Sequence, residues 1–308
     1  MAIRFGRDVC GDLTQASKHE WLVTNGIGGY ASGTISGVLT RRYHGLLIAA
    51  LKPPVARTLL VAKLDESVRY RGVDHLLHTN RWGSGAVNPA GWQYIESFSL
   101  HEGAFPTWRF AFSDALLEKT IWMEPGANTT YIRYRVVRAA LPVVLFSRVL
   151  VNHRDVHGNT AGEGAYGVEA VRRGLRIVPP DAEPFYVQSD RADASPMFDW
   201  YRDFDLPIET ERGLPDRDDH AFAGDMAVAL SQGEAVTFVA STRLLDRIAA
   251  DEAYERVLAH QRGISQRLPE GASAVLHDLA RAADQFIVAR PLADVPEGKT
   301  VIAGYHWF

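Results

Sequence analysis

The chain has 308 residues, of which 46% are hydrophobic and 23% charged, a composition typical of a globular protein with one large domain or one domain plus a small appendage. Its formal net charge is −4 with acids and bases interspersed, which argues against the one-sided basic surface that nucleic acids require. No apolar run approaches the ~20 residues needed to cross a bilayer. The first eight residues carry charges where a signal peptide has its apolar core, and Cys10 is the single cysteine. These features predict a cytoplasmic protein without disulfides, with no nucleic-acid and no membrane partner.

Short apolar runs separated by turn residues dominate from Thr34 to about Ser241. Residues 130–136 alternate as a half-buried strand does, and Gly126-Ala-Asn128 before them predicts a hairpin turn after a strand over 116–123. Because no helical pattern separates the runs, we expect a mainly β fold, a large two-sheet antiparallel β-sandwich over residues 1–241. The other expected strands lie at 59–64, 68–70, 143–146, 176–178, 185–187, 226–230 and 236–239, the first two broken by the acidic pair Asp65–Glu66.

The pattern changes after Ser241, where residues 242–308 form the second predicted unit. Residues 244–268 are rich in Ala, Glu, Arg and Leu and predict a helix, which Pro269 ends. A second helix is expected over 273–289, because apolar residues at 276, 279, 280, 283, 286 and 287 fall on one helical face. An apolar Trp307-Phe308 is unusual for an exposed terminus, so we expect the natural polypeptide to continue.

Two short motifs resemble a nucleotide-cofactor site and a metal site, but their sequence context supports neither interpretation. The stretch from Gly26 to Ala31 matches a loose dinucleotide fingerprint, but helix formers do not follow it and no acid lies about 20 residues on, so a tight glycine turn is the better interpretation. His153 and His157 flank Asp155 in a segment that reads as a loop, where their spacing has no fixed meaning for a metal. We therefore expect no metal and no cofactor.

A sugar hydrolase needs two carboxylates across the glycosidic bond. Residues 200–211 contain Asp203, Asp205, Glu209 and Glu211 beside aromatic residues, and on a strand the members of each pair would share a face. The favoured alternative is that these acids lie at a strand edge and pair with Arg202 and Arg212 at the surface.

Residues 21–47 read WLVTNGIGGYASGTISGVLTRRYHGLL, and this stretch resembles the opening signature of bacterial and archaeal glycogen debranching enzymes. Lys63-Leu-Asp-Glu66 and residues 117–123, 151–157, 200–204 and 209–213 resemble further parts of the same N-terminal domain. Residues 283–288 and 299–308 resemble the start of the catalytic domain, although the family pattern has Pro where His306 stands.

In that family a β-sandwich precedes an α/α toroid that removes α-1,6-linked glucose from branch points. The acid and base carboxylates of the family would lie beyond Phe308, as would its Trp-Gly-Arg-Asp run. The resemblance thus implies the non-catalytic N-terminal domain of an amylo-α-1,6-glucosidase, whose partners are a branched α-glucan and the catalytic domain of the same polypeptide. Two alternatives stay open: a self-sufficient glycosidase that uses the four acids above, and a free-standing carbohydrate-binding module.

Two polar segments are the candidates for contact with the glucan or the catalytic domain. We expect them together at one face of the sandwich, because a glycine turn permits close approach and Arg, Tyr, Asn and His suit sugar hydroxyls, whereas a core would have to supply each with a partner. On that view Arg42→Ala and His44→Ala leave the stability of the isolated domain nearly unchanged. The other interpretation has Arg41 and Arg42 pairing with surface acids while the glycines turn the chain. The candidates are Asn25, Gly28, Gly29 and Tyr30, then Arg41, Arg42, Tyr43 and His44, with Trp307 joining them.

Overall fold

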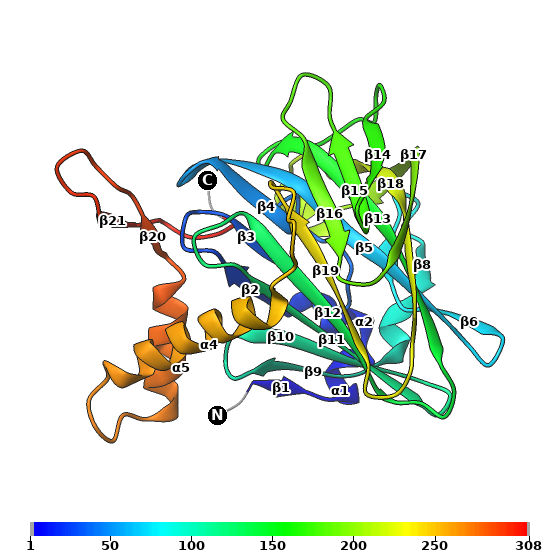
Figure 1. Ribbon diagram of the computed structural model, residues 1–308, viewed down its shortest axis with the longest axis horizontal. Helices are drawn as coiled ribbons and strands as arrows, with labels where there is room; N and C mark the ends of the chain where they lie inside the picture. Colours follow the sequence, from blue (N-terminus) through cyan, green and yellow to red (C-terminus); the bar gives the residue numbers. More distant parts are fainter. Residues whose placement is uncertain (1–2, 307–308) are drawn as a thin grey trace.

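A computed structural model describes residues 3–306, and Trp307 lies outside the described residues. Two large sheets pack face to face, and all strand pairings in this part of the chain are antiparallel (Figure 1). Their inner faces share one apolar core, in which Leu47 and Leu145 of one sheet and Leu117 and Phe238 of the other are fully buried. The two-sheet antiparallel sandwich expected from the alternating runs is confirmed.

The first sheet has nine strands in the order β1-β9-β10-β11-β12-β19-β16-β15-β14. Their bounds are β1 Arg4–Phe5, β9 Ile95–His101, β10 Phe105–Phe112, β11 Ala115–Met123, β12 Thr129–Arg138, β19 Ala235–Ser241, β16 Phe185–Ser189, β15 Gly174–Val178 and β14 Gly167–Val171. Met123 pairs with Thr130, so the predicted hairpin turn at 126–128 is confirmed.

The second sheet has the order β17-β18-β13-β5-β4-β3-β2, with β6 paired to β5. Its strands are β17 Asp193–Asp205, β18 Arg217–Leu230, β13 Val143–Asp155, β5 Val55–Tyr70, β4 Gly45–Lys52, β3 Tyr30–Thr34, β2 Glu20–Thr24 and β6 Val73–Leu76. Two smaller pairs join β7 Thr79–Arg81 to β8 Val87–Ala90 and β20 Ile287–Ala289 to β21 Lys299–Val301.

Asp65 and Glu66 do not break their strand, contrary to expectation, because β5 runs through both acids. Asp65 accepts a hydrogen bond from Asn80 (2.7 Å) and pairs with Lys63 (3.0 Å). Glu66 accepts a hydrogen bond from Tyr134 of the facing sheet (2.6 Å) and pairs with Lys119. Buried charges are tolerated where partners satisfy them, and the local sequence does not reveal Asn80, Lys119 and Tyr134, which are distant along the chain.

Short helices do occur among the strands, which corrects the expectation of none. The helices α1 Arg7–Cys10 and α2 Leu13–Lys18 precede β2, the 3₁₀ helix η1 spans Gly91–Tyr94, and α3 Pro207–Glu211 connects β17 to β18. Pro207 lies in the first turn of α3, where its missing N–H costs nothing. Glu209 and Glu211 therefore lie on a helix, whereas Asp203 and Asp205 end a strand.

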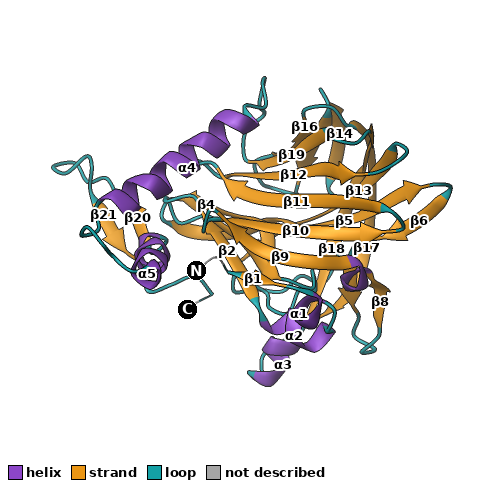
Figure 2. Ribbon diagram, turned by 90° about the horizontal axis from the view of Figure 1, so that it is seen from below, coloured by secondary structure: helices purple, strands orange, loops and turns teal. Residues whose placement is uncertain are grey.

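The region after Ser241 projects from one end of the sandwich in both views (Figures 1 and 2). The first helix, α4 Ala250–Gln266, begins later than predicted, because Gln188 binds both backbone groups of Leu245 (2.8 and 3.1 Å) and holds that residue extended. The second, α5 Ala274–Asp284, begins one residue after the predicted start at Ser273, which caps it, and ends earlier than predicted. Ile287–Ala289 instead forms β20, and Ala289 donates to the Gly26 carbonyl (2.8 Å). Among the described residues, no helix has both the length and the apolarity to cross a membrane.

Candidate functional site

The segment from Arg41 to His44 forms a turn in the connection between β3 and β4, closed by the His44 N–H donating to the Arg41 carbonyl (3.1 Å). Arg42, Tyr43 and His44 are buried, and Arg41 is half-buried. The expectation that a core would not hold this polarity is therefore wrong for three of the four residues. The reason is that distant segments supply the missing partners.

Arg42 is held by three segments that are remote in the sequence. Its guanidinium donates to the carbonyls of His157 (2.6 Å) and Pro215 (3.0 Å), and its Nε lies 3.4 Å from the Glu209 carboxylate. Glu209 is fully buried and also pairs with Arg212 of its own α3 end (3.1 Å). Removing one member of such a set leaves a buried charge without its counterion, so these side chains serve the fold before any ligand.

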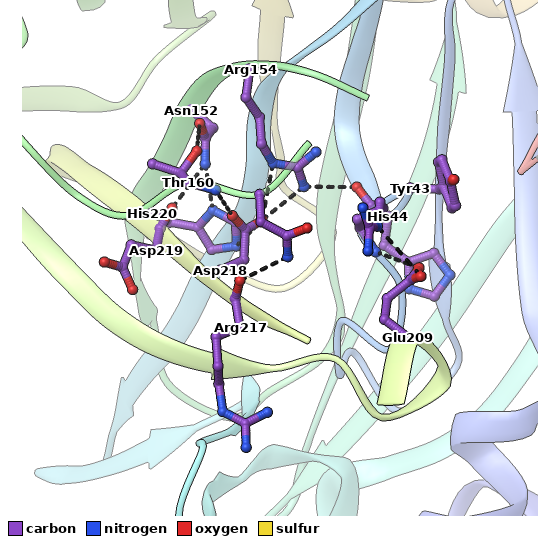
Figure 3. A network of polar contacts seen from close by, with 12 residues as sticks. Tyr43, His44, Asn152, Arg154, Thr160, Glu209, Arg217, Asp218, Asp219 and His220 are labelled. Atoms are coloured by element: carbon purple, nitrogen blue, oxygen red, sulfur yellow. Dashed lines mark hydrogen bonds and ion pairs between the residues drawn. The ribbon is translucent and has the colours of Figure 1, made fainter. Parts of the chain in front are cut away.

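A second buried ion pair adjoins the first, as Figure 3 shows. Arg154 of β13 donates to the Asp218 carboxylate (2.7 Å) and, from the same nitrogen, to the Arg42 carbonyl (2.7 Å). His220 accepts a hydrogen bond from Asn152 (3.2 Å), and burial lowers its pKa to about 4. The polar network thus connects β13 and β18 to the Arg41–His44 turn, and both of its ion pairs, Arg42–Glu209 and Arg154–Asp218, are buried.

His44 has a defined tautomer. Its Nδ1 accepts from the Thr40 backbone N–H (3.1 Å), so the proton of the neutral ring lies on Nε2, which donates to Glu20 (3.1 Å). Glu20 also receives the Arg41 Nε–H (2.6 Å). Burial alone would raise the pKa of Glu20, but the bonds from His44 and Arg41 prevail and lower it to about 2.

Tyr305 and His306 pack onto this turn from the far end of the chain. The His306 ring stacks on Tyr43 (6.2 Å between centroids) and meets His44 edge-on (5.5 Å). The Tyr305 ring meets Tyr30 (5.0 Å), whose hydroxyl donates to the Tyr43 carbonyl (3.0 Å). Burial and the neighbouring His44 lower the pKa of His306 to about 3. We call Tyr30, Tyr43, His44, Tyr305 and His306 the aromatic cluster.

Glu20, His44 and His306 bring three metal-ligand types together, with their ligand atoms within 4.8 Å of one another. A histidine that binds a metal through Nε2 must carry its proton on Nδ1 and donate it to a second partner. In His44 the Nδ1 atom is an acceptor, so Nε2 has no free lone pair. The donor set therefore fits a hydrogen-bonded His–Glu pair and not a metal centre.

The Asn25–Gly29 turn has a structural basis of its own. Asn25 accepts from the backbone N–H groups of Ile27 (3.0 Å) and Gly29 (2.9 Å), and donates to the Ala127 carbonyl (3.0 Å). Gly28 has a φ of +97°, and a Cβ there would lie 2.3 Å from the Pro54 carbonyl oxygen. Of the candidates in this turn, only Tyr30 joins the aromatic cluster, while Asn25, Gly28 and Gly29 fasten neighbouring turns together.

The four acids of the glycosidase hypothesis do not form the two same-face strand pairs that it required. Asp203 is exposed and pairs with Arg217 (3.3 Å), whereas Asp205 is buried between Arg81 (2.5 Å) and Arg217. Glu209 is enclosed with Arg42, and Glu211 is exposed on α3. The predicted partner Arg202 instead pairs with Asp219 (3.3 Å), while the predicted Arg212 does pair with Glu209.

Comparison with known proteins identifies the chain's relatives. The family model described as glycogen debranching enzyme N terminal matches residues 19–237. The chain belongs to this family. The matched part of this debranching-enzyme N-terminal domain includes Glu20, Arg42, His44 and Glu209, whereas Tyr305 and His306 lie beyond it.

Other comparisons add little. Among curated proteins, none matches the sequence. A solved structure of a candidate kojibiose phosphorylase from the human microbiome shares 7% identity, covers 87% of this chain and has a TM-score of 0.30, too low to carry an argument. The chain spans 36% of the length of that protein.

Sequence reasoning missed several residues of the site. Glu20, Arg154 and Asp218 each lie beside other charged residues or histidines, so their local patterns do not reveal which of these residues has a buried or half-buried partner. His306 departs from the family pattern, and its local sequence does not indicate the contact with His44. The expectation of a loop around His153 and Asp155 is wrong, because β13 extends through Asp155 and includes His153.

Proposed function

We propose that this chain is the non-catalytic N-terminal domain of a glycogen debranching enzyme in the cytoplasm. On this proposal it supports the hydrolysis of α-1,6-glucosidic branch points in glycogen-like glucans by a catalytic domain that follows it in the same polypeptide. Its partners are the branched α-glucan and that catalytic domain. The family match over residues 19–237 supports this assignment.

The packing of Tyr305 and His306 onto Tyr30, Tyr43 and His44 is the observation that carries the proposal. This packing sets the direction in which the chain continues after α5 and the β20–β21 hairpin. A domain attached at this point inherits that orientation. The aromatic cluster then acts as a positioning element, and the buried Arg42–Glu209 pair beneath it keeps the turn rigid.

The placement of the acids does not support glycoside hydrolysis by this chain alone. A glycosidase needs one carboxyl group as a general acid and another as base or nucleophile, both open to the sugar. Here Asp205 and Glu209 are buried against arginines, and Asp203 also pairs with one. We therefore expect no glucose release from a branched limit dextrin by this chain alone.

The direct test begins with the coding sequence after Phe308. We expect it to continue into a domain that bears catalytic carboxylates, and an immediate stop codon would overturn the proposal. Debranching is then measured as glucose released from limit dextrin, by the longer enzyme and by this chain. Activity of this chain that Asp203→Asn or Glu211→Gln abolishes would favour the glycosidase instead.

The positioning role is tested in the longer enzyme with His306→Ala. Loss of the stacked ring should lower kcat severalfold and broaden the interdomain distances seen by small-angle scattering, while His306→Phe should restore both. His75→Ala is the matched control, because it removes a ring that contacts Tyr94 and Phe112 away from the cluster (5.6 and 5.1 Å). Unchanged kcat and scattering in His306→Ala would contradict the role.

A further inference from the structure

A deep groove separates the first sheet from the C-terminal helices and is distinct from the aromatic cluster. Its floor is the outward face of β9 to β12, its wall is α4, and its roof is α5, with β2 closing one side. The cavity measures about 1770 Å³. Pockets for drug-sized molecules measure about 300–1,000 Å³, so this one has room for a longer ligand.

The roof presents its polar side to the groove. His277, Asp278, Arg281 and Gln285 recur at helical spacing and line the cavity. The apolar residues of the same helix are exposed, with Leu279 at 60%. An amphipathic helix normally buries its apolar stripe, so α5 has the reverse orientation and turns polar side chains toward the groove, whose floor and wall also present Trp122, Tyr254 and Val257.

Both helices are fastened to the sandwich. The Tyr254 ring of α4 stacks on Phe105 (4.1 Å), and Arg256 binds Glu124 through two nitrogens (2.7 and 2.8 Å). On α5, the Gln285 side chain donates to the Leu22 carbonyl (3.3 Å). Arg281 lies against Gly103 of the β9–β10 turn, where a Cβ would approach its Nη1 to 2.5 Å. The groove therefore has fixed walls.

The floor carries hydroxyl and charged groups in rows, as outward positions of a sheet do. Thr107 and Thr120 face each other across β10 and β11 with their hydroxyls 3.3 Å apart. Beside them Arg109 pairs with Glu118 (3.0 Å), and Arg135 of β12 is exposed. Thr107 is buried and its hydroxyl donates to the Phe105 carbonyl (3.0 Å), so Arg135 and the Arg109–Glu118 pair are the floor groups that can exchange hydrogen bonds with sugar hydroxyls.

The charges of the lining nearly balance, which decides the class of ligand. Six basic residues stand against five acids, so the groove lacks the excess positive charge that a polyphosphate or nucleic acid requires. The basic residues are Arg4, Arg109, Arg133, Arg135, Arg281 and Lys299, and the acids are Glu20, Glu102, Glu118, Asp278 and Asp284.

We propose that this groove binds a neutral oligosaccharide several sugar units long. The proposal rests on the proposed function and deepens it, because it assigns the glucan a binding site on this chain, away from the aromatic cluster and from the catalytic centre. Hydroxyls of the sugar would exchange hydrogen bonds with the floor and the roof at once.

Titration calorimetry of the chain with maltoheptaose tests the proposal, with heparin as the polyanionic probe. We expect saturable binding of maltoheptaose at micromolar to millimolar concentration and none of heparin. Arg135→Ala on the floor and His277→Ala on the roof should each weaken binding about tenfold, the loss expected for hydrogen bonds made by charged or polar groups that contact the ligand.

Arg172→Ala is the matched control, because Arg172 is an exposed arginine in the turn between β14 and β15, outside the groove. It should leave the affinity unchanged, and the melting temperatures of all three variants should match that of the parent chain. Lack of saturable maltoheptaose binding would overturn the proposal. So would binding that Arg135→Ala and His277→Ala leave intact, or binding of heparin in its place.

Discussion

The turn beneath the aromatic cluster and the groove beside the helices use the same kinds of side chain in opposite ways. At the turn, Arg42 and Arg154 are buried and each has a carboxylate partner and a carbonyl partner within the fold. In the groove, Arg135 is exposed and the polar side of α5 faces open space. Buried polar residues that satisfy one another stabilise a fold, whereas exposed ones that line a cavity, such as Arg135, can also contact a ligand.

The same contrast holds for apolar residues. In the sandwich Leu117 is fully buried, whereas Leu279 of α5 and Val301 of β21 are 60% and 73% exposed. The sandwich thus has a continuous apolar core, and its buried Arg42 and Arg154 have carboxylate partners. The C-terminal region is fastened to the sandwich by a few contacts, and both polar and apolar side chains of this region remain exposed.

The largest effect should come from breaking the buried ion pairs. Glu209→Ala leaves the Arg42 and Arg212 guanidinium groups without their carboxylate, and should cost about 3–5 kcal/mol of unfolding free energy, measured in urea. Asp251→Ala, which removes an exposed partner of Arg133, should cost less than about 1 kcal/mol. By the same reasoning Arg42→Ala should destabilise the isolated domain, contrary to the expectation from sequence. Equal, small effects of Glu209→Ala and Asp251→Ala would remove the distinction between the two regions.

A smaller loss is expected at Gly28. Alanine there combines a φ of +97° with a clash against the Pro54 carbonyl, which should cost about 3 kcal/mol in the same assay. Gly26→Ala in the same turn has a φ of +72° but open space around the new Cβ, and should cost about 1 kcal/mol. If both variants unfold at the same urea concentration, the close approach of Gly28 to the Pro54 carbonyl does not contribute to the cost of the substitution.

Acid should destabilise the fold through His306, a member of the aromatic cluster. The pKa of His306 is lowered to about 3 in the fold and is about 6.5 when unfolded, so the unfolded chain takes up the proton first. The stability that is present above pH 6.5 is then lost as the pH falls towards 3. Between pH 7 and 5 the parent chain should lose up to about 2 kcal/mol more than His306→Phe. His220 is present in both proteins and its pKa is lowered in both, so the difference between their pH profiles comes from His306. Parallel profiles of unfolding free energy against pH for the parent chain and His306→Phe would contradict the prediction.

The smallest effect should fall on the exposed face of α5. Leu279→Ser should change the unfolding free energy by less than about 0.5 kcal/mol, because the side chain is already in water. Leu117→Ala in the core provides the contrast and should cost about 3 kcal/mol. A large loss in Leu279→Ser would mean that this helix face is covered in solution.

Local patterns in the sequence predicted the fold well where their signal matched the burial. Alternation over residues 130–136 and the turn at 126–128 predicted β12 and its hairpin, and apolar residues at helical spacing after Ser273 predicted α5. They failed at Asp65 and Glu66, at residues 207–211 and at residues 287–289. In each case a distant partner decided the outcome: Lys119 and Tyr134 for the acids, the Thr40 carbonyl for Ile208 of α3, and the Gly26 carbonyl for β20.

The sequence by itself determined the sandwich, the glycine turn and the family signature, because periodicity and turn residues act over a few neighbours. Only the tertiary structure decided that Arg42 is a buried anchor, that His306 reaches His44, and that α5 turns its polar side inward over a groove. These features depend on pairing across tens to hundreds of residues. The physical reason is that a buried charge is stable only beside its partner, and the chain order of two residues does not specify whether folding brings them together.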